Sequence, residues 1–142
     1  MFIKTLPVIV FITSFVLTAS TARAGDLNIE VSVLGDRPGN VMAALFDKAE
    51  GFPRGTPLRT AMVKSVQGKA NLQFAGLPKG DYAISAFLDE NSNNKLDTNL
   101  FGIPTELYGF SRNARRRSGP PPFVEAAFRV EGSTVLLAFE LK

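Results

Sequence analysis

The chain has neither cysteine nor histidine among its 142 residues, and these absences exclude several classes of function. Without histidine there is no Ser-His or Cys-His nucleophile system and no histidine-based zinc site. Without cysteine there is no disulfide, although export would permit one. Stability must therefore come from a hydrophobic core or a bound ion. We expect a binding or structural role and no enzymatic activity.

Residues 25–142 also lack a strong net charge. The whole chain has 16 basic and 13 acidic residues, and Lys4 and Arg23 precede residue 25. Residues 25–142 therefore carry 14 basic and 13 acidic side chains, a net charge of +1. This balance gives no general attraction to nucleic acid, and no nucleic-acid partner is expected.

The first 24 residues have the pattern of a signal peptide. Lys4 precedes an apolar stretch from Leu6 to Leu17, and Ala22-Arg23-Ala24 is a small-residue cleavage site. The apolar stretch is shorter than the roughly 20 residues of a membrane-spanning helix. We expect export to the periplasm, with secretion as an alternative, and cleavage after Ala24. One domain, residues 25–142, would remain without a transmembrane segment; an uncleaved anchor is the other interpretation.

The rest of the chain alternates apolar and polar residues with the two-residue period of β-strands. The apolar run Val41–Phe46 is continuous, as in a central strand, and no segment has a helical period. A final hairpin is expected across the turn Glu131-Gly132-Ser133. About seven strands with Gly and Pro turns predict an all-β, two-sheet β-sandwich. The expected strands are 27–33, 41–46, 58–66, 70–74, 82–88, 124–130 and 135–141.

Two connections are too long for hairpins, namely 47–57 and 89–122. Long ordered loops in small domains are often functional. In the second connection, oxygen-bearing groups stand at loop positions one, three, five, seven and nine. These candidate calcium ligands are Asp89, Asn91, Asn93, the carbonyl of Lys95, and Asp97.

The same loop departs from an EF-hand in two ways. Asn94 replaces the usual Gly, and Leu100 stands where a bidentate Glu is expected. Asn99 or Glu106 is available to complete the coordination. With two certain carboxylates, the expected dissociation constant is on the order of 10⁻⁴–10⁻³ M. The alternative is a metal-free turn held by Asx hydrogen bonds, since Asn and Asp favour such turns.

Two further groups of residues follow this loop. The apolar residues Ile103, Leu107, Tyr108 and Phe110 are expected to cover one end of the sandwich, or else to form an aromatic platform for a ligand. An arginine cluster comes next and is a candidate site for phosphate or carboxylate, although a solvated loop is the alternative. Its members are Arg112, Arg115, Arg116 and Arg117.

Five stretches of the sequence belong together: V-M-A-A-L-F from Val41, L-P-K-G-D-Y-A-I from Leu77, D-E-N-S-N-N-K-L-D-T-N from Asp89, G-I-P-T-E-L-Y-G-F-S from Gly102, and P-P-F-V-E-A-A-F from Pro121. In combination they resemble one family of exported bacterial proteins, grouped as domain of unknown function 2141. The resemblance implies export and a transthyretin-like or immunoglobulin-like sandwich, and it assigns no activity. Family members usually carry Gly at the position of Asn94. The L-P-x-G-x-Y stretch implies a tyrosine that caps a strand corner.

The leading interpretation is an exported, non-catalytic module that binds a small ligand or an envelope protein and has a calcium-stabilised loop. One alternative is a hydrolase of an envelope saccharide that uses Asp89, Asp97 and Glu106 as paired carboxylates. Another is a domain that pairs with a partner protein through an exposed strand edge.

Overall fold

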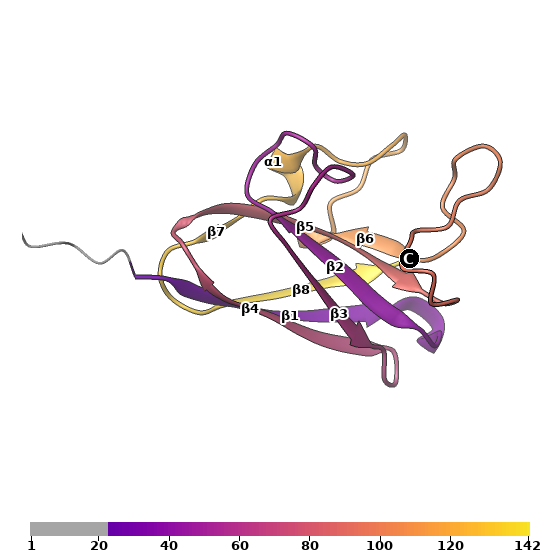
Figure 1. Ribbon diagram of the computed structural model, residues 1–142, viewed down its shortest axis with the longest axis horizontal. Helices are drawn as coiled ribbons and strands as arrows, with labels where there is room; N and C mark the ends of the chain where they lie inside the picture. Colours follow the sequence, from indigo (N-terminus) through magenta and orange to yellow (C-terminus); the bar gives the residue numbers. More distant parts are fainter. Residues whose placement is uncertain (1–22) are drawn as a thin grey trace, which may run out of the picture.

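A computed structural model describes residues 23–142, which form two β-sheets packed face to face (Figure 1). Residues 1–22 of the expected signal peptide lie outside the described residues. The smaller sheet has the order β4-β1-β8, from β1 (Gly25–Val33), β4 (Lys69–Leu77) and β8 (Val135–Leu141). β1 is antiparallel to β4 and parallel to β8.

The larger sheet has the order β3-β2-β5-β6, and β7 also pairs with β5. Its strands are β2 (Asn40–Phe46), β3 (Arg59–Lys64), β5 (Gly80–Asp89), β6 (Tyr108–Phe110) and β7 (Phe128–Val130). β7 covers residues 80–82 of β5, and β6 covers residues 85–87 on the same edge. A four-residue helix, α1 (Phe123–Ala126), and two short 3₁₀ turns complete the described elements.

The core lies between the two sheets and follows from the two-residue period of the strands. Every second residue of β1 is buried, from Leu27 to Val33, and β2 contributes Val41, Ala43 and Leu45. β5 contributes Ile84, Ala86 and Leu88 from its inner face. Alternating side chains of a strand point to opposite faces, so these residues meet in one layer. The all-β sandwich expected from the sequence is confirmed.

The expected hairpin between residues 124–130 and 135–141 is wrong. β7 is antiparallel to β5, whereas β8 pairs in parallel with β1 in the other sheet. Val124 and Ala126 belong to α1, where Phe123 packs edge-on against Phe52 over the larger sheet. This packing holds residues 123–130 beside β5. An alternating pattern favours a half-buried strand, but here only residues 128–130 form one, and the pattern does not identify the strand's partner.

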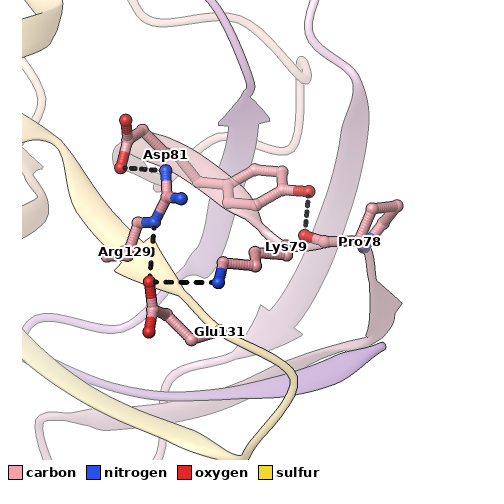
Figure 2. Close-up of polar contacts among 6 residues, drawn as sticks. Pro78, Lys79, Asp81, Arg129 and Glu131 are labelled. Atoms are coloured by element: carbon pink, nitrogen blue, oxygen red, sulfur yellow. Dashed lines mark hydrogen bonds and ion pairs between the residues drawn. The ribbon is translucent and has the colours of Figure 1, made fainter. Parts of the chain in front are cut away.

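The expected tyrosine corner is present at the start of β5. The Tyr82 hydroxyl donates a hydrogen bond of 2.7 Å to the Pro78 carbonyl, and the side chain is 4% exposed. Beside it, Arg129 of β7 contacts Asp81 and Glu131, each at 3.2 Å, and Lys79 lies 3.8 Å from Glu131 (Figure 2). These exposed ion pairs contribute little energy but fit the register in which Arg129 lies opposite Asp81.

Replacing Tyr82 by Phe is expected to lower the free energy of unfolding by about 1 kcal/mol, because the part-buried hydrogen bond from the Tyr82 hydroxyl to the Pro78 carbonyl is lost. Urea unfolding at neutral pH measures this loss. Tyr108→Phe is the matched control, since no hydrogen bond from the Tyr108 hydroxyl occurs within residues 23–142. An equal loss in the two variants would contradict the role of the Tyr82 hydrogen bond.

A comparison of the wild-type protein with Tyr82→Phe also tests how stability depends on pH. Burial, with a smaller contribution from the Asp47 carboxylate, raises the pKa of the Tyr82 phenol. The folded state therefore favours the protonated phenol, and this stabilisation is complete below about pH 10, the ordinary tyrosine pKa. It is lost as the pH rises through the raised pKa. The stability difference between wild type and Tyr82→Phe should therefore shrink above about pH 10.

Candidate functional site

A cleft of about 880 Å³ lies over the outer face of the larger sheet. Figure 1 shows the three connections that frame it, residues 47–58, 90–107 and 111–127, on the same side of the molecule. The volume falls within the range of roughly 300–1,000 Å³ that is typical of small-ligand sites. Both long connections that the sequence analysis selected therefore border one cavity.

The floor of the cleft is built from side chains of neighbouring strands that stand opposite one another. The pairing of β2, β5 and β6 aligns Met42, Phe87 and Tyr108 in one row across the sheet. A second row contains Ala44, Ser85 and Phe110. Met42, Ala44 and Phe87 are half-buried, although they face away from the core. This placement explains why Val41–Phe46 is apolar without interruption: one face enters the core and the other forms the floor of the cleft.

A cluster of aromatic side chains fixes the first wall of the cleft. The Phe52 ring lies edge-on to Phe46, Phe110 and Phe123, with ring centroids 5.3, 6.0 and 5.8 Å away. The adjacent Pro53 and Arg54 line the cleft. Because edge-to-face aromatic pairs add stability beyond area burial, the connection 47–58 is anchored to the sheet at Phe52.

The buried hydroxyl of Ser111 connects the second wall to the sheet. Its Oγ accepts a 2.9 Å hydrogen bond from the backbone N–H of Ile84 and donates to the carbonyl of Ala126. Ile84 lies between the segments of β5 that β7 and β6 cover, so no strand supplies a partner for this N–H. The hydroxyl thus fills the gap in the sheet edge and holds α1 against it.

The acidic loop 89–97 is closed by its own hydrogen bonds. The Asp89 carboxylate, 1% exposed, accepts from the backbone N–H groups of Asn93 at 3.2 Å and Asn94 at 2.9 Å. Asn91 and Asn93 each accept a backbone N–H two residues further on, as in Asx-turns. Asn94 adopts a left-handed conformation with φ 59°, as the calcium-loop pattern requires at that position.

Three of the predicted calcium ligands converge. The side-chain amides of Asn91 and Asn93 donate to the Asp97 carboxylate at 2.5 and 2.8 Å. A calcium ion needs oxygen ligands, so both amides would have to turn over and give up their Asx-turn bonds. Within residues 23–142 no cluster of three or more acidic side chains is suited to a metal. The hydrogen bonds agree with the metal-free alternative, and calcium binding stays a prediction.

Glu106 holds the two ends of this loop together, although the sequence analysis considered it only as an extra ligand or a catalytic carboxylate. Its side chain is 7% exposed and accepts one hydrogen bond from the Glu90 N–H and one from the Asp97 N–H, both at 3.0 Å. Beyond it, the tip carries Leu100 and Phe101, which are 101% and 86% exposed. The loop is therefore rigid at its base and apolar at its tip.

The four arginines of the predicted cluster do not converge on one point. Arg112 donates to the Ala127 carbonyl, and Arg115 lies 5.6 Å from the ring centroid of Tyr108 and donates to the Lys142 carbonyl. Arg116 pairs with Glu125 at 2.7 Å, and this ion pair raises the pKa of Arg116 and lowers that of Glu125. Only Arg116 and Arg117 line the cleft.

Sequence reasoning missed the cation that completes the site. Arg54 lies in the cleft with Arg116 and Arg117, although more than sixty residues separate it from them in the chain. The only signal available was its position in the first long connection. The apolar residues after Gly102 behave differently from the expected end cover. Leu107 packs on the core and Phe110 is buried, but Ile103 is 59% exposed and lines the cleft with Tyr108.

Residues 29–137 match the family model described as "Uncharacterized protein conserved in bacteria (DUF2141)". The chain belongs to this family. The resemblance recognised from the sequence is thus confirmed, and the match extends from β1 to β8 across all three connections of the cleft. No curated protein and no solved structure matches this DUF2141 protein. Between residues 23 and 142, none of its helices is long and apolar enough to cross a membrane.

Glu106→Gln is expected to lower the free energy of unfolding by about 1–3 kcal/mol. One of the two backbone N–H groups would face an amide N–H instead of a carboxylate oxygen and lose its acceptor. Urea unfolding measures the change, with Glu131→Gln as control because Glu131 is exposed and makes ion pairs only. Equal stability of the two variants would show that Glu106 does not hold the loop.

The calcium hypothesis predicts that Ca²⁺ at ten times its dissociation constant stabilises the protein by about 1.4 kcal/mol, a rise of several degrees in Tm. Mg²⁺ should have no such effect. Asp97→Asn should abolish the rise, and it is a better test than Asp89→Asn because Asp89 is buried and structural. An unchanged Tm between excess EDTA and millimolar Ca²⁺ would establish the loop as a metal-free turn.

Proposed function

We propose that this DUF2141 protein is an exported, non-catalytic module that binds a small ligand in the cleft over β2, β5 and β6. The observation that carries the proposal is a concave, largely apolar site with a few convergent polar groups, the combination typical of ligand sites. Export is supported by the signal-peptide pattern of the sequence and is part of the proposal.

The outer faces of the two sheets differ in a way that favours this location. On the smaller sheet, a concavity of about 580 Å³ is bordered by Leu136 and Ala138 of β8 and by the polar side chains of β1 and β4, namely Asn28, Glu30, Asn71 and Gln73. Such alternation is expected for a sheet face in contact with water. The larger sheet presents Met42 and Phe87 instead, within walls made by loops. An apolar surface held open between ordered loops is better suited to a ligand than to water.

The cleft does not favour the hydrolase alternative. Asp89 and Glu106 are buried and accept hydrogen bonds from backbone N–H groups. No carboxylate of residues 23–142 lines the cleft, and the sequence has no histidine to act as a base. Paired-carboxylate hydrolysis requires two such groups on either side of the scissile bond. A binding role needs no such pair.

Calcium has a place in this proposal as a weak stabiliser of one wall. Asn94 and Leu96 of the loop 89–97 line the cleft. A cation held by Asp97 and its neighbours would therefore order the wall that contacts the ligand, and it would act on binding through the conformation of the loop.

The neutral fluorescent probe N-phenyl-1-naphthylamine tests whether the cleft binds apolar molecules. We expect its emission to increase with the wild-type protein and to lose most of this increase in Ala44→Phe, because the new ring fills the floor. Ala138→Phe is the matched control, since it places the same ring on the outer face of the smaller sheet.

Circular dichroism must first show that both variants are folded. An emission increase that Ala138→Phe removes and Ala44→Phe preserves would move the site to the smaller sheet. The absence of any increase with the wild-type protein would contradict the binding of neutral apolar molecules in the cleft.

A further inference from the structure

We infer that the ligand of the cleft is an anionic amphiphile, a molecule with one carboxylate or similar anionic head and an apolar tail. This inference rests on the proposed binding role of the cleft and specifies its ligand class. It is carried by the separation of charge and apolar surface within one cavity, where three arginines border a floor of apolar side chains.

The charge of the cleft is positive. Among residues 23–142, the three charged residues that line it, Arg54, Arg116 and Arg117, are all cationic. Glu125 offsets the charge of Arg116 through their ion pair. Arg54 and Arg117 have no carboxylate partner within residues 23–142, so two positive charges remain uncompensated. Guanidinium groups bind carboxylates and phosphates through charge-assisted, often bidentate hydrogen bonds.

The apolar part of the cleft is large enough to require an apolar partner. Met42 and Phe87 form the floor, and Leu96 and Ile103 stand in the wall of the 90–107 connection. A small inorganic anion would contact the arginines and leave this surface in water. A neutral hydrocarbon would cover the surface and leave two cations without counter-charge. An anion with an apolar tail satisfies both parts of the cleft at once.

The test compares two probes that share a ten-carbon chain and differ only in the head, decanoate and decan-1-ol. Each is titrated against N-phenyl-1-naphthylamine bound to the full mature chain at neutral pH. We expect decanoate to displace the probe at a concentration about tenfold lower than decan-1-ol, the effect of one charge-assisted hydrogen bond. Isothermal titration with decanoate measures the same binding directly, whether or not the fluorescent probe binds.

Two double variants of equal charge assign the effect. Arg54→Gln/Arg117→Gln should abolish the preference for decanoate and leave the affinity for decan-1-ol unchanged. Lys69→Gln/Lys79→Gln removes the same charge from surface ion pairs outside the cleft and should keep the preference. All four side chains are exposed, so the variants are expected to fold.

Each other outcome rejects the inference. Equal displacement by decanoate and decan-1-ol would leave the cleft as a binding site without anion preference, so the proposed function would stand and the ligand class would fail. Loss of preference in the lysine variant would assign the effect to net charge. Binding of neither the fluorescent probe nor decanoate would reject both the ligand class and the proposed function.

Discussion

The divided edge of β5 is the constraint on which the rest of the site depends. One edge of this strand pairs with β2 at residues 83–89, while the other is shared by β7 at residues 80–82 and β6 at residues 85–87. The chain leaves β5 and returns as β6, then leaves β6 and returns as β7. The connections 90–107 and 111–127 therefore both return to β5, and both lie over the larger sheet.

A side-chain hydroxyl fills the gap between β7 and β6 along the edge of β5. The backbone N–H of Ile84 lies in this gap. A buried N–H without an acceptor would lower the stability of the fold by about 1–3 kcal/mol. The Ser111 hydroxyl accepts that hydrogen bond and donates its own to the carbonyl of Ala126 in α1. One hydroxyl therefore completes the sheet edge and fixes the start of the connection that brings Arg116 and Arg117 to the cleft.

The sequence predicts those features that depend on neighbouring residues and not those that depend on distant ones. Most strand positions follow from alternation, although residues 124–126 of one expected strand are helical and β6 is not among the expected strands. The Tyr82 corner follows from a short motif whose hydrogen bond spans four residues. The parallel pairing of β8 with β1 and the antiparallel pairing of β7 with β5 join segments far apart in the chain, and alternation carries no information about either. The same limit applies to the site. Arg116 and Arg117 were recognisable as a run, but the approach of Arg54 to them depends on the anchoring of Phe52 to three aromatic rings.

The two sheets of this protein provide an internal comparison for the function of the cleft. Each sheet packs its inner face against the other sheet, and the two inner faces together form one core. On the smaller sheet, most outward positions of β1 and β4 are polar, as expected for a face in contact with water.

On the larger sheet, Phe52 and Phe123 cover one end of the outer face, and packing against them explains the apolar residues at that end. Met42 and Phe87 lie outside this aromatic cluster and are half-buried in the cleft, which uncompensated arginines also line. Core packing does not account for that arrangement, whereas the proposed ligand with an apolar tail and an anionic head would.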